Sequence, residues 1–328
     1  MRLIRHCGEL PPDLKGSVVA LGNFDGVHKG HQAVILTARR IADELGAPLA
    51  VMSFEPHPRS FFKPDQPPFR LTPFRVKARL IEALGADLAV MQHFDAAFAG
   101  MTAQEFVATV LVGGLAARHV VVGYDYVFGK GRQGTGALLQ KMADDGNFGF
   151  TSVPPEIGPD GDVYSSTRVR DLLVAGRPAE AAKLLGHYWE VEGRVEHGDA
   201  RGRTIGFPTA NFALGEYQRP ATGVYAVRAG IDLGATTVWH NGVANFGRRP
   251  TFDKTDEVLE VHLLDVTVDL YGKHLRVALI DFLRPELKFS GLAALKAQIE
   301  ADAQAARALL AARHFPDSPG PMVPVGDN

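Results

Sequence analysis

The pattern of hydrophobic residues changes once along the chain, near residues 186–188, and this change limits the folds that the sequence can adopt. Before it, short apolar runs rich in valine alternate with helical stretches, which is typical of a doubly wound parallel sheet. After it, apolar and polar residues alternate with a period of two, as in an antiparallel sheet or barrel. We therefore predict an α/β domain at residues 1–186 and an antiparallel β-barrel domain at residues 187–313.

A parallel sheet of this kind binds its ligand beyond the carboxyl ends of its strands. Its expected strands are Val18–Leu21, Leu49–Phe54, Leu88–Met91, Val120–Gly123 and Phe150–Val153, with helical stretches near residues 32–45, 74–84, 102–113, 136–145, 168–175 and 178–185. The strands expected in the second half are Trp189–Val195, Gly223–Ala229, Thr236–Val243, Val258–Val266 and Leu275–Phe282, and one long helical pattern, Leu292–Arg313, follows them. Four prolines and two glycines predict a disordered tail at residues 314–328.

Length, charge and cysteine content limit the class of protein. A chain of 328 residues is long enough for two domains. The net charge of −2 gives no basis for a nucleic-acid partner, and no stretch approaches the roughly 20 apolar residues of a membrane span. The residues Met1–Lys15 lack the apolar core of a signal peptide, and Cys7 is the only cysteine, which suits the reducing cytoplasm. We expect a cytoplasmic protein with small-molecule substrates and no membrane partner, and homo-oligomerisation stays open.

The segment at residues 22–31 reads Gly-Asn-Phe-Asp-Gly-Val-His-Lys-Gly-His and stands between the first expected strand and the first expected helix. Its glycines allow a tight turn, and the helix start offers backbone N–H groups and a positive dipole end to a phosphate. His28 and His31 are three residues apart, so both imidazoles can reach one phosphate group. The pattern resembles the His-x-Gly-His signature of nucleotidyltransferases, which implies that the imidazoles stabilise the transition state of adenylyl transfer. A surface turn with two incidental histidines explains less, because strand, glycines and helix all agree.

Two further segments are expected to converge on this turn. Asp125 follows the strand Val120–Gly123 and so stands at the carboxyl edge of the sheet. Ser166 and Thr167 precede an expected helix, where hydroxyls together with Arg170 suit an anion such as a leaving pyrophosphate. Simple helix capping would explain the two hydroxyls on their own. In combination with the histidines, we favour phosphate binding.

A second candidate site lies at residues 202–211, which read Gly-Arg-Thr-Ile-Gly-Phe-Pro-Thr-Ala-Asn. Thr209 and Asn211 are two residues apart, so in an extended segment their oxygen atoms face the same side. A hydroxyl and an amide carbonyl are neutral oxygen ligands that suit a Mg²⁺ ion carrying waters and ATP oxygens. Gly202 and Gly206 allow the backbone to approach phosphates closely. An ordinary Asn/Thr turn is the competing interpretation.

A candidate general base lies in the expected strand Val258–Val266. Leu259, Val261 and Leu263 share one face of this strand, which leaves Glu260 on the other face. A carboxylate held there could accept the proton of a primary hydroxyl that attacks a γ-phosphate. For a lone glutamate, however, a solvated strand residue is the simpler explanation.

These motifs together resemble, in family order, the two modules of bacterial bifunctional riboflavin kinase/FAD synthetases. The resemblance covers about residues 16–313 and is carried by Gly22–His31, Phe54–Arg59, Gly123–Gly129, Ser165–Arg170, Gly202–Asn211, Gly223–Tyr225, Asn245–Gly247, Glu260–His262, Tyr271–Lys273 and Arg284–Phe289. It implies a riboflavin kinase at residues 187–313, which converts riboflavin and ATP to FMN and ADP. It also implies an FMN adenylyltransferase, or FAD synthetase, with a Rossmann-like fold at residues 1–186, which converts FMN and ATP to FAD and diphosphate. Both reactions would use Mg²⁺.

The resemblance also implies roles for single residues. The catalytic residues would be His28, His31 and Arg170 in adenylyl transfer and Glu260, as the base, in the kinase. ATP in the adenylyltransferase would contact Gly22, Phe24, Asp25, Gly30, Asp125, Ser166 and Thr167. In the kinase, Thr209 and Asn211 would hold Mg²⁺, and ATP and flavin would contact Gly202, Arg203, Gly206, Phe207, Pro208 and Arg284. Phe54, His57 and Pro58 also match the family, although a rigid loop explains them, and Tyr126 stands where phenylalanine is commoner.

Two other functions compete with that of a bifunctional enzyme. One is an enzyme that keeps a single activity and uses the other half as a scaffold. The other is a flavin-binding regulator without turnover. The chemical groups named above argue against both, because a site without turnover has no need of two histidines, a metal-ligand pair and a base.

Overall fold

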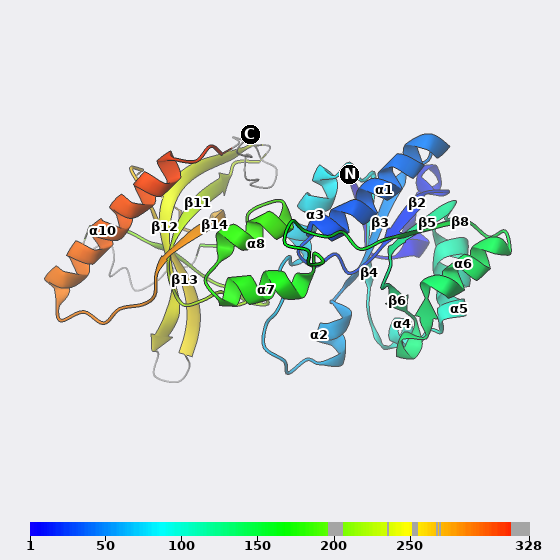
Figure 1. The fold of residues 1–328 in the computed structure, drawn as a ribbon, viewed down its shortest axis with the longest axis horizontal. Coiled ribbons are helices and arrows are strands. Elements are labelled where there is room, and N and C mark those ends of the chain that lie inside the picture. Colours follow the sequence, from blue (N-terminus) through cyan, green and yellow to red (C-terminus); the bar gives the residue numbers. More distant parts are fainter. Residues whose placement is uncertain (196–205, 235, 251–254, 267, 269, 316–328) are drawn as a thin grey trace. The chain divides into compact units, whose positions relative to one another are not determined.

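The structure is a computed structural model that describes the chain except residues 196–205, 235, 251–254, 267, 269 and 316–328. Contacts divide the chain into two compact units (Figure 1). The first unit comprises Met1–Pro67 and Lys77–Ser165, and the second comprises Pro68–Val76 and Ser166–Asn328. The candidate residues Gly202 and Arg203 and most of the predicted tail lie outside the described residues.

The first unit contains a six-stranded parallel sheet in the order β1-β4-β3-β2-β5-β8. Its strands are β1 (Arg2–Ile4), β2 (Val18–Leu21), β3 (Leu49–Glu55), β4 (Leu88–His93), β5 (His119–Gly123) and β8 (Gly149–Val153), and β6 (Val127–Phe128) and β7 (Gly134–Thr135) form a separate hairpin. The helices are α1 (Lys29–Leu45), α2 (Pro58–Phe62), α3 (Phe74–Ala83), α4 (Ala96–Ala99), α5 (Ala103–Phe106) and α6 (Gly136–Asp144), with a π-helical segment, η3 (Val107–Gly114), after α5. Short 3₁₀ turns lie at Cys7–Glu9, Pro12–Leu14 and Lys130–Arg132.

Helices cover both faces of this sheet, which confirms the predicted doubly wound class. The four residues of β2 are all buried, because a strand inside such a sheet meets helices above and below. Val19 and Leu21 face a core that includes Leu111 of η3 and Leu139 of α6. Helix α1 packs against β2, β3 and β5. The carboxyl ends of these strands therefore form one exposed edge at which the loops that follow them gather.

The second unit is an antiparallel sheet in the order β10-β13-β12-β11-β14-β9, as predicted for this half. Its elements are α7 (Ser166–Val174), α8 (Pro178–Leu185), β9 (Glu190–Arg194), β10 (Ala210–Ala213), β11 (Gly223–Asp232), β12 (Thr237–Pro250), β13 (Thr255–Leu263), β14 (His274–Arg284) and α10 (Leu292–Ala311). The edge strands β9 and β10 approach each other, so the sheet curls into a near-barrel. Helix α10 packs along β11, β12 and β14 (Figure 1).

The division of the chain by contacts falls between Ser165 and Ser166, which is before the predicted boundary between the two activities at residues 186–187. Helix α8 packs against β14, and its Ala182 belongs to the same core as α10. The segment Pro68–Val76 joins this unit by hydrogen bonds, because Trp189 Nε1 donates to the Leu71 carbonyl at 2.9 Å and Arg70 pairs with Glu216 at 3.2 Å. The boundary at 186–187 stays a prediction about where the two activities divide.

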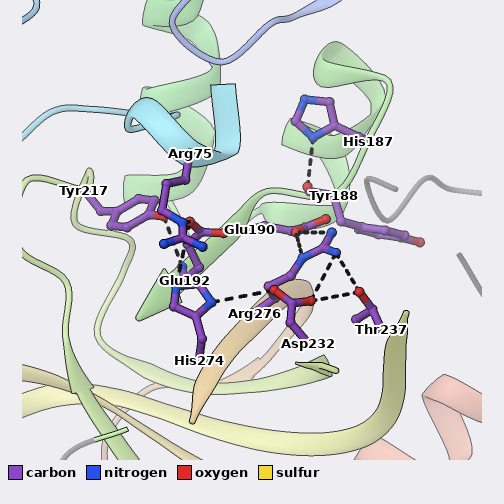
Figure 2. Close-up of polar contacts among 10 residues, drawn as sticks. All are labelled: Arg75, His187, Tyr188, Glu190, Glu192, Tyr217, Asp232, Thr237, His274 and Arg276. Atoms are coloured by element: carbon purple, nitrogen blue, oxygen red, sulfur yellow. Dashed lines mark hydrogen bonds and ion pairs between the residues drawn. The ribbon is translucent and has the colours of Figure 1, made fainter. Parts of the chain in front are cut away.

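A buried polar network joins β9 and β14 in the second unit (Figure 2). The Arg276 guanidinium donates to Glu190 Oε2 from Nε at 3.1 Å and from Nη2 at 2.9 Å, and both side chains are almost fully buried. The same guanidinium lies 4.8 Å from the Trp239 ring centroid, a favourable cation–π distance. Next to it, His274 lies between Glu192 and Asp232. None of the residues in this network is a predicted catalytic or binding residue, and the network connects β9 with β14.

Candidate active sites

The turn after β2 has an unusual backbone. Phe24 and Val27 both have positive φ, at 47° and 43°, which side-chain-bearing residues seldom adopt. Phe24 turns its ring back over Gly22, where a Cβ atom would stand only 2.8 Å from the ring. The glycine is therefore required by close approach. The ring of Phe24, which is 1% exposed, in turn packs edge-on against His31 at 5.4 Å.

The two histidines of the turn stack on each other. Their ring centroids are 3.7 Å apart, with an interplanar angle of 23°. His28 is the N-cap of α1, and its Nδ1 accepts a hydrogen bond from the His31 backbone N–H at 3.4 Å. Because Nδ1 accepts, the cap assigns the ring proton of neutral His28 to Nε2, which then acts as a donor. Helix α1 begins at Lys29, earlier than the expected residue 32, because this side-chain cap satisfies its first turn.

A buried lysine that the sequence patterns do not single out, Lys77, binds the backbone of the turn after β2. Lys77 on α3 is 0% exposed, and its ammonium donates to the Asn23 carbonyl at 2.9 Å and to Ser53 Oγ at 3.1 Å. Ser53 on β3 donates to the same carbonyl at 3.0 Å. A buried charge is costly without such partners, so this arrangement anchors the turn on β3 and α3. The only sequence signal was a lysine on the apolar face of a helical pattern.

The other adenylyltransferase candidates lie in different elements. In the first unit, Asp25 is buried in the turn, Gly30 lies in the first turn of α1 and Asp125 is exposed just after β5. In the second unit, α7 begins at Ser166, so Ser166 and Thr167 occupy its first turn and do not precede it as capping residues. Arg170 Nε donates to the Phe69 carbonyl at 2.8 Å, and its guanidinium lies 5.4 Å from the Phe69 ring. The expected convergence of these residues on the histidines stays a prediction.

The second site is built on neighbouring strands of the antiparallel sheet. Asn211 on β10 stands directly opposite Glu260 on β13, and Glu260 stands opposite Asn245 on β12. Side chains in such a row project from the same face of the sheet, with Cβ atoms about 5 Å apart. The register therefore brings the predicted base beside one of the two predicted metal ligands. No local sequence pattern encodes this register, and Asn245 belongs to the sequence motifs only as part of the segment Asn245–Gly247.

The amide of Asn211 carries an orphaned oxygen. The residue is 7% exposed, and its Oδ1 is buried without a hydrogen-bond partner among the described residues. Its Nδ2 is oriented by a long, 3.5 Å contact to the Thr209 carbonyl. A buried polar atom without a partner is rare and requires an explanation, for which a water, an ion or a bound ligand qualifies. A neutral amide oxygen of this kind is among the ligands that Mg²⁺ accepts.

His262 holds the segment that leads into β10. Its Nδ1 lies 2.8 Å from the Pro208 carbonyl, and its ring meets Phe207 edge-on at 5.6 Å. Gly206, with φ of 93°, begins the described part of this segment. These contacts place His262 as a support for Thr209, a role that the sequence pattern did not suggest beyond putting it on the face of Glu260.

Arg284, which is predicted to contact substrate, forms an ion pair with Asp302. It donates to both carboxylate oxygens of Asp302 on α10, at 2.8 and 2.7 Å, and to the Pro285 carbonyl at 2.9 Å. The pair is mostly buried and connects the end of β14 to α10. Its predicted role toward ATP or flavin stays a prediction.

Two family models match consecutive parts of the chain. Residues 10–168 match the model described as FAD synthetase, and residues 185–310 match the model described as riboflavin kinase. An Escherichia coli (strain K12) protein named bifunctional riboflavin kinase/FMN adenylyltransferase is 44% identical over 309 residues, which cover 94% of this chain and 97% of that protein. A Bacillus subtilis (strain 168) protein of the same name is 42% identical, and the match covers 88% of this chain and 91% of that protein.

A solved structure also shares the fold. The crystal structure titled macrolide-efflux protein from Streptococcus pneumoniae superposes with a TM-score of 0.81 at 34% identity, and the match covers 93% of this chain and 98% of that one. Within the described residues of this chain, no helix has both the length and the apolarity of a membrane span. The fold and the two family matches together define a two-module, ATP-dependent transferase. The chain belongs to the family of bifunctional riboflavin kinases/FMN adenylyltransferases.

Proposed function

We infer that this chain performs both steps of FAD synthesis from riboflavin. The kinase module transfers the γ-phosphate of ATP to riboflavin and releases ADP. The adenylyltransferase module then joins the FMN phosphate to the α-phosphate of a second ATP and releases diphosphate. Both family matches and relatives more than 40% identical along nearly the whole chain support the two activities. The single cysteine suits a cytoplasmic enzyme.

In adenylyl transfer, the stacked histidines stabilise the negative charge that develops on the phosphate oxygens in the transition state. His28 Nε2–H donates to a phosphate oxygen, since its Nδ1 is committed to the helix cap. His31 lies against it and is held by the Phe24 ring. Neither imidazole needs to form a bond to phosphorus. Arg170, with Ser166 and Thr167, neutralises charge on the departing diphosphate.

In the kinase reaction, the observation that carries the proposal is the cross-strand pairing of Asn211 with Glu260. Glu260 accepts the proton of the riboflavin primary hydroxyl as that oxygen attacks the γ-phosphorus of ATP. Asn211 Oδ1 and the Thr209 hydroxyl would hold Mg²⁺, which supplies positive charge to the ATP phosphates. The register sets Asn211 opposite Glu260, which supports this division of roles between the two residues.

The two roles are separable by kinetics. Glu260→Gln keeps the size of the side chain and removes the proton acceptor, so the kinase kcat falls by about 10²-fold with little change in nucleotide affinity. Asn211→Ala and Thr209→Ala raise the Mg²⁺ concentration needed for half-maximal rate, and part of their loss is recovered at high Mg²⁺. Initial rates of FMN formation across a Mg²⁺ titration measure both effects.

Glu300→Gln is the matched control, because Glu300 lies exposed on α10 and keeps the same change of charge away from the sheet face. It should leave the kinase rate and its Mg²⁺ dependence unchanged. FAD formation from supplied FMN should continue in all four variants. Near-normal turnover in Glu260→Gln would show that Glu260 is only a solvated strand residue.

A further inference from the structure

A lysine stands between the two histidines of the turn after β2. Lys29 is the first residue of α1, and its side chain is exposed. Residues one or two positions apart on a helix do not face each other, so the spacing places Lys29 on a different side of α1 from the stacked pair of His28 and His31. A positive charge in the first turn of a helix is also unfavourable, because it meets the positive end of the helix dipole. A lysine at this position therefore requires an explanation.

The ammonium group of Lys29 lies over the ring of Tyr164. Its Nζ atom is 5.8 Å from the ring centroid, within the distance at which a cation is attracted to the face of an aromatic ring. The backbone of Tyr164 is close to the turn as well, because a Cβ atom at Gly30 would stand 3.5 Å from the Tyr164 carbonyl oxygen and 3.2 Å from the His28 ring. Side chain and backbone of Tyr164 therefore both lie against the start of α1.

Tyr164 ends a small hairpin at residues 156–164. Its backbone N–H donates to the Glu156 carbonyl at 3.1 Å, and Ile157 forms an antiparallel bridge with Val163. These two apolar side chains are 59% and 36% exposed, so they bury little surface against the rest of the first unit. A segment with few buried apolar contacts has low local stability, and single contacts at its ends then influence its position. The contact of Tyr164 with Lys29 is one of these.

The chain after this hairpin carries a predicted part of the adenylyltransferase site. Ser165 is the last residue of the first unit, and α7 begins with Ser166 and Thr167 directly after it. Consecutive Cα atoms are about 3.8 Å apart, so the position of Tyr164 limits where the Ser166 hydroxyl can lie. The two hydroxyls of α7 are predicted to contact ATP. A contact between Tyr164 and the start of α1 can therefore act on them through the chain.

We propose that Lys29 and Tyr164 are positioning residues for adenylyl transfer. The lysine ammonium holds the aromatic ring, and with it the end of the hairpin, against the start of α1. This contact places the hydroxyls of Ser166 and Thr167 where they reach the phosphates of ATP bound at the histidines. The inference rests on the proposed FMN adenylyltransferase activity, and it gives Lys29 a task other than direct contact with substrate.

The test is a double-mutant cycle on FAD formation from FMN, with Lys29→Met, Tyr164→Leu and the double variant. A cation–π contact at an exposed site corresponds to a factor of about two to five, so each single substitution should lower kcat by roughly that factor. The double variant should be no slower than the slower single variant, because both substitutions remove the same contact. The KM for FMN and the Tm should stay near their wild-type values, since the hydroxyls act on ATP and neither side chain is buried.

Conservative variants separate the contact from a general loss of structure. Lys29→Arg keeps the cation and Tyr164→Phe keeps the ring, so both should retain a kcat within about 1.5-fold of the wild-type value. Lys141→Met is the matched control for the loss of a lysine charge, because Lys141 is exposed on α6. It should change none of these values. FMN formation from riboflavin should be unaffected in all variants.

Three outcomes would overturn the proposal. The first is a kcat within about 1.5-fold of the wild-type value in either Lys29→Met or Tyr164→Leu. The second is a double variant whose loss is the product of the two single losses, because Lys29 then acts on ATP without the tyrosine. The third is an equal loss in Tyr164→Phe and Tyr164→Leu, which would assign the effect to the hydroxyl. Wild-type protein that forms no FAD contradicts the adenylyltransferase activity itself, which distinguishes that failure from an error about Lys29 and Tyr164.

Discussion

Adding one methyl group at Gly22 should disable FAD synthesis and spare the kinase. The Cβ of Gly22→Ala would stand 2.8 to 3.1 Å from three atoms of the Phe24 ring. Since ordinary carbon contacts are about 3.5–4.0 Å, the ring must move by roughly 1 Å. Phe24 packs directly on His31, so this shift is passed to the histidine pair. A displacement of about 1 Å at a catalytic group can cost 10²-fold in rate, and overpacking of this kind costs about 1–3 kcal/mol in stability.

The assay measures both activities of each variant at a temperature where thermal scans show it folded. We expect Gly22→Ala to lower the kcat of FAD formation from FMN by about 10²-fold, with FMN formation from riboflavin within twofold of the wild-type rate. Gly8→Ala provides the control, because a Cβ at Gly8 meets no atom within 4 Å. Folded Gly22→Ala protein with a normal rate of FAD formation would refute the role given to Phe24 and His31.

Three further predictions concern stability. Burial lowers the pKa of His119 below its ordinary value, so the folded state favours the neutral ring. This contribution to stability is lost as the pH falls through the folded pKa. The drop in Tm between about pH 7 and pH 5 should therefore be smaller in His119→Gln than in the wild type, and an equal drop would contradict this. Arg276→Met removes the guanidinium that pairs with the buried Glu190 carboxylate and should cost about 3–5 kcal/mol in denaturant unfolding, most of which Arg276→Met/Glu190→Leu should recover. Residues 187–328 expressed alone should melt below residues 166–328, because they lack α8 and its core residue Ala182, and equal melting temperatures would count against the contact division.

The class of each half could be predicted because it depends on local patterns. Buried parallel strands are valine-rich in this sequence, and antiparallel strands alternate with a period of two, so both sheets follow from the residues. The short strands β1 and β10 were missed, since three or four residues give too little pattern. The predicted start of α7 was late because Ser166 and Thr167 were interpreted as capping residues.

The features that the sequence could not supply depend on long-range contacts. The pairing of Asn211 with Glu260 requires the strand register, which no local pattern encodes. The association of Pro68–Val76 with the second unit rests on hydrogen bonds such as that from Trp189 to Leu71, and these leave no periodic signal. The burial of Lys77 beneath the Asn23 carbonyl is of the same kind. The candidate residues themselves were recognised from motifs, and the structure adds the contacts that hold them.

The central claim is that one chain holds two separable activities, and product analysis by chromatography tests it most directly. Wild-type protein incubated with riboflavin, ATP and Mg²⁺ should form FMN, ADP, FAD and diphosphate. His28→Ala should stop at FMN, and Glu260→Gln should form FAD only when FMN is supplied. FMN without FAD would indicate that only the kinase module is active, and FAD formed only from supplied FMN would indicate that only the adenylyltransferase module is active. No product from either riboflavin or FMN would indicate a binding protein. Loss of both activities in either folded variant would contradict the assignment of the two reactions to separate sites.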